Sequence, residues 1–194
     1  MACHDDRTLW DKLRVANPTA SEEELIRMDA LCNSIVFTSQ GVPFLPIGDD
    51  FLRTKKGSSN SYNLPDSINQ IDWSRKAQYP AVAAFYQQLL ALRKAHPAFR
   101  LPTQSLIAQH LTFLPGLPPG TIGYQLTDHA GGDAWQTITV LFNGLRQPAT
   151  VPVPAGSYKV VLRGLDIKQS GLETLNAGTS GVAVPGSTAL VLVQ

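Results

Sequence analysis

The sequence is poor in the features that mark several large protein classes. Its two cysteines, Cys3 and Cys32, are too few for a disulfide scaffold and lack the spacing of a metal site. No apolar run reaches the ~18 residues that span a bilayer, and no signal-peptide pattern is visible at the start. The 16 Lys and Arg against 15 Asp and Glu leave a formal charge of +1, without a long basic stretch. We therefore expect neither a membrane nor a nucleic acid as partner.

Motifs for common cofactors and nucleophiles are missing as well. No Gly-rich phosphate loop follows a predicted strand, and no Gly-x-Ser-x-Gly elbow occurs. The residues Cys3, His4 and Asp5 are adjacent, so on a strand they would point to alternate faces rather than converge on an ion. We expect no metal and no cofactor, and composition alone describes residues 4–6 as a solvated polar segment.

The chain does contain enough apolar residues for a real core. Hydrophobic residues make up 43% of its 194 residues, which fits one ordinary domain or two small ones. The 15 Gly and 14 Pro predict many turns and loops. The pattern changes near residue 104, so we predict a helical unit over residues 1–103 and a β unit over residues 104–194.

Two longer helices are predicted in the first unit. Ser21 and Glu24 have the spacing of a capping box, which predicts a helix over 21–39. Pro80 sits at the first turn of a second helix, over 80–95. A short helix is predicted over 8–13, and the apolar run 42–47 is predicted as a strand at a sheet edge because it contains Pro43 and Pro46. The predicted apolar faces are Leu25, Met28, Leu31, Cys32 and Ile35 on the first helix and Val82, Phe85, Tyr86, Leu89 and Leu92 on the second.

Short strands separated by turn signals predict an antiparallel β-sandwich in the second unit. Turns are indicated by Pro118-Pro119-Gly120, Gly131-Gly132-Asp133, Asn143-Gly144, Pro154-Ala155-Gly156 and Pro185-Gly186-Ser187. The predicted strands span residues 106–114, 121–127, 137–142, 149–153, 158–162 and 188–193.

The polar connection over residues 48–78 is unusually long for a compact domain, and such loops are usually functional. Amides, carboxylates and Arg bind hydroxyl groups, while Tyr and Trp faces cover the apolar side of a sugar ring. The composition therefore suits a carbohydrate, and it equally suits a solvated loop whose Asn and Asp form turns. The polar and aromatic residues in question include Arg53, Asn60, Tyr62, Asn63, Asp66 and Trp73.

Several motifs follow one another in a specific order along the first unit. They are residues 4–13, His-Asp-Asp-Arg-Thr-Leu-Trp-Asp-Lys-Leu, residues 39–44, Ser-Gln-Gly-Val-Pro-Phe, and the segments 51–55, 60–63 and 66–73. Together they resemble glycoside hydrolase family 13, the α-amylase family, and most of all its type I pullulanase branch. The first is similar to the fourth signature of that family, the second resembles its Gln-Gly-Ile-Pro-Phe strand, and the last three resemble its pullulanase-type loop. The resemblance is strong over residues 4–100 and weaker to the end.

This resemblance implies an α+β fold, in which the last strands and helices of a (β/α)8 barrel precede an antiparallel β-sandwich. It implies helix seven at 21–39, strand eight at 42–47 and helix eight at 80–95, with the loop 48–78 on the active-site rim. Asp5 would stabilise the transition state in the −1 subsite and His4 would bind the same sugar. Arg53, Asn60, Tyr62, Asn63 and Asp66 are the further residues expected to bind substrate.

The resemblance also implies what a piece of this kind would lack. Retaining glycosidases need two carboxyl groups about 5–5.5 Å apart, and in this family both come from earlier barrel strands. The parent would be an α-1,6-glucan debranching hydrolase acting on a branched α-glucan, and this chain alone would be inactive. We also expect self-association through its truncated barrel surface.

Two departures from the family pattern bear on the subsite. Asp6 stands where the branch usually has Asn, and residues 45–50, Leu-Pro-Ile-Gly-Asp-Asp, differ from the usual Phe-x-Ala-Gly-Gln/Glu-Glu. The alternative from another class is a non-catalytic β-sandwich that binds carbohydrate or is purely structural. Exposed aromatics in the second unit would favour the binding module, and of its aromatic residues Trp135 lies beside a Gly-rich turn.

Overall fold

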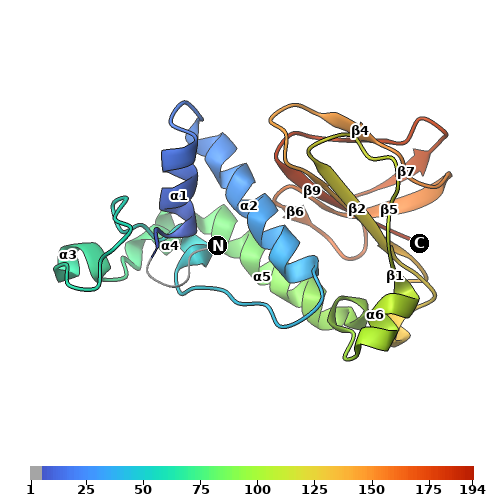
Figure 1. Ribbon diagram of the computed structural model, residues 1–194, viewed down its shortest axis with the longest axis horizontal. Helices are drawn as coiled ribbons and strands as arrows, with labels where there is room; N and C mark the ends of the chain where they lie inside the picture. Colours follow the sequence, from blue (N-terminus) through green and yellow to red (C-terminus); the bar gives the residue numbers. More distant parts are fainter. Residues whose placement is uncertain (1–5) are drawn as a thin grey trace.

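The computed structural model describes residues 6–194 and shows a layer of helices packed on an antiparallel sheet (Figure 1). Within these residues no helix has both the length and the apolar character needed to cross a bilayer. The helices are α1 (Leu9–Ala16), α2 (Glu22–Thr38), α3 (Asp66–Asn69), α4 (Ser74–Gln78), α5 (Pro80–Ala95) and α6 (Gln104–His110). Single 3-10 turns lie at η1 (Asp49–Phe51), η2 (Pro97–Arg100) and η3 (Ala130–Gly132).

The β half forms one large sheet and one small one, and all their pairs are antiparallel. The large sheet has the order β1-β2-β3-β9-β5-β6, with β7 also pairing with β5, while β4 and β8 form the small sheet. The strands are β1 (Leu111–Phe113), β2 (Thr121–Leu126), β3 (Ile138–Asn143), β4 (Ala149–Val151), β5 (Gly156–Arg163), β6 (Asp166–Ile167), β7 (Glu173–Ala177), β8 (Val182–Val184) and β9 (Thr188–Val193).

Local signals fix the two long helices where the sequence predicts them. The Ser21 hydroxyl accepts a hydrogen bond from the Glu24 amide at 3.2 Å, and the Glu24 carboxylate accepts one from the Ser21 amide at 2.8 Å. This completes the predicted capping box. Pro80 occupies the first position of α5, whose predicted apolar face is buried as expected. On α2, however, Ile35 is exposed, and the buried face includes the polar residues Asp29 and Asn33.

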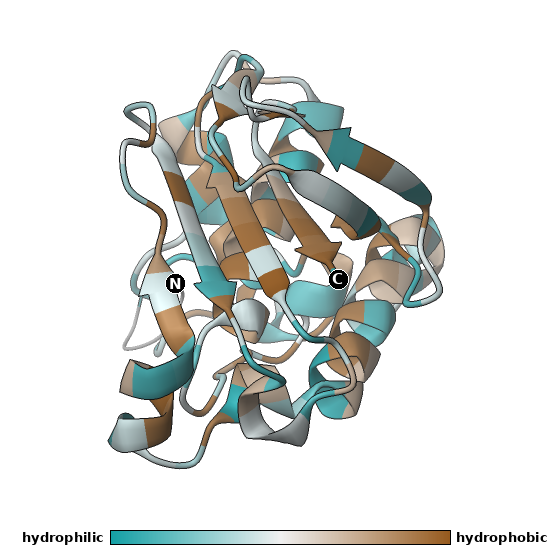
Figure 2. Ribbon diagram, turned by 90° about the vertical axis from the view of Figure 1, so that its right-hand side faces the viewer, coloured by the Kyte–Doolittle hydropathy of each residue, from teal (hydrophilic) through white to brown (hydrophobic). Residues whose placement is uncertain are grey.

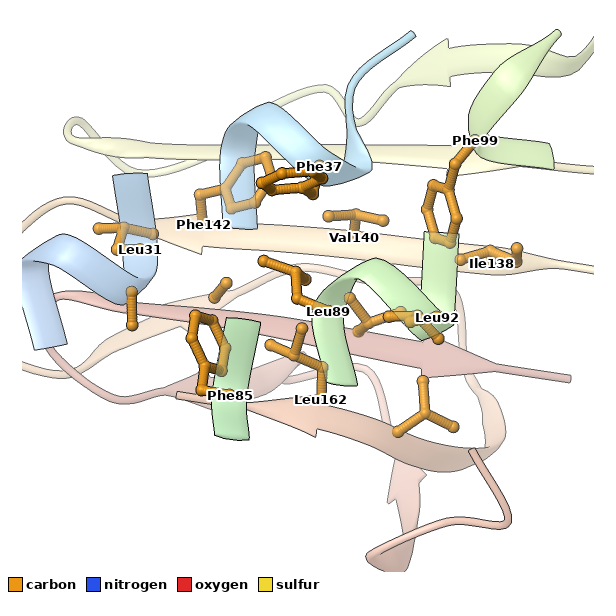
Figure 3. Close-up of a cluster of buried hydrophobic side chains, with 14 of the residues drawn as sticks. Leu31, Phe37, Phe85, Leu89, Leu92, Phe99, Ile138, Val140, Phe142 and Leu162 are labelled. Atoms are coloured by element: carbon orange, nitrogen blue, oxygen red, sulfur yellow. The ribbon is translucent and has the colours of Figure 1, made fainter. Parts of the chain in front are cut away.

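One face of the large sheet shares its core with α2 and α5. Side chains from both helices point toward Val140 and Phe142 of β3 and Leu162 of β5 (Figure 3). Successive residues of a strand face opposite sides, so Leu141 of the same strand packs in a second cluster on the other face. The helices and the sheet therefore bury their apolar residues against each other rather than in separate cores.

The second face of the sheet is covered by the small sheet β4–β8. Val151, Val182 and Val184 of the small sheet pack with Leu190 and Leu192 of β9. Strands β3 and β9 are buried along their whole length, and the middle of the sheet is accordingly mostly brown in Figure 2. The mixed helical and antiparallel architecture predicted from the sequence is confirmed.

Polar contacts join the helices to the sheet. The His96 ring, after α5, lies 2.9 Å from the Asp133 carboxylate and stacks on Trp135 with 3.4 Å between ring centroids. Despite burial, hydrogen bonds from His96 and the Trp135 amide hold the pKa of Asp133 below its usual value. The Tyr124 hydroxyl of β2 donates to the Thr38 carbonyl at 2.6 Å, at the end of α2. These buried bonds fix how the two layers sit on each other.

The strand predicted at 106–114 is largely wrong. Residues 104–110 form α6, because the Thr103 hydroxyl caps the Leu106 amide at 3.3 Å and starts a helical turn. Only Leu111–Phe113 form a strand, β1. Strands β6, β7 and β8 were not predicted, since they are only 2, 5 and 3 residues long and are too short to show a clear period-two pattern.

The strand predicted at 42–47 is also absent. This segment is extended and pairs with no strand of the described chain, and it runs from the end of α2 back along the helices (Figure 1). Val42 is 98% exposed, Phe44 68% and Ile47 56%. The two prolines remove two backbone donors, and no neighbouring strand lies in the described residues to pair with the rest.

Candidate functional site

The first part of the polar loop, residues 53–66, is fastened to helix α1 by a buried carboxylate. Asp11 is 3% exposed and accepts hydrogen bonds from the Thr54 hydroxyl at 2.5 Å and from the Lys55 amide at 2.6 Å. Its own amide donates to Thr8, which caps the helix. Both oxygens of Asp11 are thereby used to hold the loop, and charge-assisted bonds of this kind are the stronger ones.

The segment that leads into α1 touches the same loop. The Arg7 guanidinium donates to the Gly57 carbonyl at 2.9 Å. The Asp6 carboxylate pairs with Lys12 at 2.5 Å, and this bond together with one from the Arg7 amide lowers the pKa of Asp6. His4 and Asp5, the two residues that the resemblance places in the −1 subsite, lie outside the described residues. Arg7, two residues after Asp5, is the residue that contacts the loop, at Gly57.

A second set of hydrogen bonds shapes the loop itself. The Lys55 ammonium donates to the Ser61 hydroxyl at 3.0 Å, and the Asn69 amide donates to the carbonyls of Ser61 and Leu64 at 2.6 and 2.8 Å. The Arg53 guanidinium donates to the Asn69 carbonyl at 2.9 Å. Arg53 therefore braces the loop from inside, and the loop closes on itself through Ser61 and Asn69.

The other expected substrate-binding residues lie on the outside of the loop. Asn60, Tyr62, Asn63 and Asp66 are exposed, and Tyr62 exposes 80% of its surface. An exposed phenol ring beside amide and carboxylate groups provides an apolar face and several hydrogen-bonding groups. The structure thus brings these four residues together at the surface of one braced loop and places Arg53 beneath it.

Two depressions flank this loop. One, of about 560 Å³, lies between α1, the turn at residues 17–20 and Lys56–Gly57, with Trp10 and Arg14 in its wall. The other, of about 620 Å³, is more apolar and lies between residues 45–51 and the start of α5. Trp73, 61% exposed, packs on Phe51 there with 5.4 Å between ring centroids. In residues 6–194, no three His, Cys, Asp or Glu side chains gather as metal ligands would.

Sequence reasoning missed the residues that hold the loop. Asp11, Ser61 and Asn69 are ordinary polar residues in the sequence, and nothing in their spacing shows that they face one another. Their partners lie from 5 to 44 positions away along the chain. A pattern of local periodicity cannot detect such pairs.

Removing the Asp11 carboxylate should free the loop from α1. In Asp11→Ala the amide of Lys55 loses its buried, charged acceptor, at a local cost of about 2–3 kcal/mol. We expect amide exchange over residues 54–57 to be about 30- to 150-fold faster. Hydrogen exchange with mass spectrometry measures this. Arg14→Ala, an exposed change on the same helix, should leave those amides unchanged, and equal exchange in both variants would contradict the tether.

Comparison with known proteins finds similarity to pullulanases along nearly the whole chain. The family model described as pullulanase, all-beta domain, matches residues 107–165. The chain is 41% identical over 138 residues to the pullulanase of Bacillus subtilis (strain 168), which is 71% of this chain and 19% of that protein.

Comparison with solved structures also finds similarity to pullulanases. The pullulanase from Bacillus acidopullulyticus superimposes with a TM-score of 0.91 and 42% identity, over 98% of this chain and 23% of that chain. The pullulanase of Anoxybacillus sp. LM18-11, solved in complex with maltotetraose, superimposes with a TM-score of 0.86 and 37% identity, over 99% of this chain and 27% of that chain. The chain is thus pullulanase-like in sequence and fold, and it spans about a quarter of the length of the proteins that it matches.

Proposed function

We propose that this chain is the C-terminal segment of a pullulanase-like α-1,6-glucan debranching hydrolase. In this proposal residues 1–103 supply the end of a (β/α)8 barrel, and residues 104–194 form a structural β-sandwich. The coverage of the match supports the proposal. The similarity to the Bacillus acidopullulyticus pullulanase extends over 98% of this chain but over only 23% of that protein. The substrate would be a branched α-glucan such as pullulan, starch or glycogen.

The arrangement of α2, residues 42–47 and α5 supports the barrel part of the proposal. They would be helix seven, strand eight and helix eight, and the extended, unpaired segment with exposed Val42 and Phe44 suits a strand whose neighbours belong to another part of the barrel. The loop that follows, 48–78, would then lie on the rim where barrel enzymes bind substrate.

The contact between Arg7 and Gly57 is the observation that supports placing His4 and Asp5 near the loop. It sets Arg7, two residues after Asp5, against the loop that exposes Asn60, Tyr62, Asn63 and Asp66. In the proposal Asp5 stabilises the oxocarbenium-like transition state, His4 binds the same sugar, and the loop residues bind neighbouring sugar hydroxyls. Arg53 contributes by bracing the loop.

The chain alone would not hydrolyse glucans in this account. Transition-state stabilisation by Asp5 is useful only beside a nucleophile and a general acid, which the family places on earlier barrel strands. A graft tests the proposal: this chain replaces the matched segment of the Bacillus acidopullulyticus pullulanase, and pullulan hydrolysis is followed by reducing-sugar release. We expect the graft to hydrolyse pullulan and the isolated chain to release nothing. A folded but inactive graft, or turnover by the isolated chain, would refute the proposal.

The alternative, sugar binding by the β half alone, finds little support among its aromatic residues. Tyr124, Phe142 and Tyr158 are buried, and Trp135 is half-buried under the His96 ring. Phe113, 65% exposed on β1, stands at the sheet edge. Sugar-binding platforms need an open ring face, so we assign this half a structural role beneath the helices.

We expect the isolated chain to self-associate through residues 42–47. Val42, Phe44 and Ile47 present apolar side chains together with unpaired backbone, and both features favour association. Sedimentation velocity should show a concentration-dependent dimer. The triple variant Val42→Ser, Phe44→Ser, Ile47→Ser should sediment as a monomer, whereas Phe113→Ser on the far sheet edge should still dimerise. A wild-type chain that remains monomeric at all concentrations would contradict this expectation.

A further inference from the structure

Two buried carboxyl groups lie at the point where the 48–78 loop begins. Asp29 of α2 is 1% exposed, and Asp49 of η1 is 3% exposed. One oxygen of Asp29 accepts a hydrogen bond from the Tyr86 hydroxyl of α5 at 2.7 Å, and the Asn33 amide donates to that same hydroxyl. The second oxygen of Asp29 and Oδ2 of Asp49 are buried without a hydrogen-bond partner.

Among the described residues, no basic side chain forms an ion pair with either carboxyl group. The charge of Arg53 lowers the pKa of Asp49, but burial outweighs it. The Nη2 of Arg53 donates to the Asn69 carbonyl, and its Nε is buried without a hydrogen-bond partner. Arg75, from α4, donates to the Leu52 carbonyl instead. Neither arginine forms an ion pair with Asp29 or Asp49.

The remaining groups around the pair are neutral or acidic. Cys32 of α2 and Tyr86 of α5 stay protonated at neutral pH, since burial raises the pKa of the Cys32 thiol to about 11 and lifts that of Tyr86 well above its usual value. Asp50, next along η1, adds a negative charge. A carboxylate buried without a cation carries a large desolvation cost, which the group avoids by taking up a proton.

We propose that Asp29 and Asp49 form a proton-operated latch that holds η1, and with it the start of the 48–78 loop, against α5. With the carboxyl groups protonated, η1 stays seated and keeps Phe51 and Leu52 buried at 1% and 0% exposure. With both ionised, two negative charges are buried without an ion pair among the described residues, and η1 lifts away.

The direction of the pH dependence follows from the raised pKa values of Asp29 and Asp49. Burial, with a contribution from the charge of Asp49, raises the pKa of Asp29 to about 8, and burial together with Asp50 raises that of Asp49 to about 7. Both values lie above the 3.8 of a free aspartate. The folded site therefore binds more protons than the open one, so its stability is complete below about pH 4 and is lost as the pH rises toward 8.

The geometry of η1 provides a local reporter. Gly48 and Leu52 flank the turn with positive φ values of 91° and 59°, and the Leu52 amide donates to the Asp49 carbonyl at 3.2 Å. The amides of Phe51 and Arg53 both donate to the Gly48 carbonyl. These three hydrogen bonds break if η1 moves away from α5. Their exchange can be measured whether or not the chain binds a glucan, so the latch can be tested independently of the proposed function.

Amide hydrogen exchange of residues 51–53 at pH 5, 7 and 8 tests the latch on the isolated chain. After correction for intrinsic exchange, we expect protection of these amides to fall at least tenfold from pH 5 to pH 8. In the double variant Asp29→Asn, Asp49→Asn it should stay constant within about threefold, because neither of the two carboxyl groups remains to titrate. Asp166→Asn, an exposed aspartate on β6, should keep the wild-type dependence.

Direct titration of the carboxyl carbons by NMR provides a second measurement if the double variant fails to fold. Both groups should titrate above pH 6, and midpoints below pH 5 would overturn the latch. A flat wild-type exchange profile would overturn it as well. Protection restored at pH 8 by Ca²⁺ alone would also overturn it, because the pair would then bind a metal ion rather than a proton.

Discussion

Replacing Asp5 by Asn in the graft is expected to lower kcat/KM for pullulan by about 10²–10³-fold, which corresponds to about 3–4 kcal/mol of transition-state stabilisation. The reason is that an oxocarbenium-like transition state gains positive charge that the ground state lacks. A carboxylate fixed in the −1 subsite stabilises that charge, whereas an amide of the same shape does not. The loss should appear mainly in kcat, since substrate binding in the ground state changes little.

The neighbouring carboxylate provides the matched control. Asp6 is partly exposed and forms an ion pair with Lys12, so Asp6→Asn should change kcat/KM only a few-fold. Equal losses for Asp5→Asn and Asp6→Asn would contradict the role assigned to Asp5, and so would an Asp5→Asn graft with unchanged kcat.

Replacing Phe85 by Ala is expected to lower the free energy of unfolding by about 3–5 kcal/mol. Phe85 is 1% exposed, stands edge-on to Tyr86 at 5.6 Å between centroids, and packs from α5 into the core shared with the sheet (Figure 3). Its removal leaves a cavity that the sheet cannot fill without bending. Urea unfolding followed by circular dichroism measures the change.

The same experiment tests whether the two layers unfold together. Because α5 and β3 share one cluster of buried side chains, we expect far-ultraviolet and aromatic signals to change in one transition in both wild type and Phe85→Ala. Leu90→Ala, on the same helix but 46% exposed, should cost less than about 1 kcal/mol. Similar losses at Leu90 and Phe85, or a variant in which only the helical signal shifts, would contradict the shared core.

The elements that could be predicted from the sequence are those fixed by local chemistry. Ser21 with Glu24 and Pro80 start helices whatever lies around them, and turn residues such as Asn143-Gly144 separate strands. Residues 42–47 were predicted as a strand because they are apolar, yet a strand also needs a partner. The helix at 104–110 was missed because the apolar residues of 106–114 indicate a strand, whereas Thr103 caps and starts a helical turn.

The candidate site could be predicted only as far as the family resemblance reaches. That resemblance assigned roles to His4 and Asp5 and indicated the loop, and the described structure adds the exposure of Asn60, Tyr62, Asn63 and Asp66. The resemblance could not show that Arg53 holds the loop together rather than binding substrate. That distinction depends on the hydrogen bond from Arg53 to the Asn69 carbonyl. Nor could it show which acidic residues are buried, since Asp29 and Asp66 look alike in a sequence.

The most direct test of the proposed site is a crystal structure of the graft with bound maltotetraose. Sugar hydroxyls should lie within hydrogen-bonding distance of Asp5, about 2.5–3.2 Å, and of at least one of Asn60, Asn63 and Asp66, on the same face of the barrel. Tyr62 should lie over a sugar ring or at the edge of the bound chain. A sugar bound at Asp5 with the 58–66 loop on the opposite side of the molecule would contradict it.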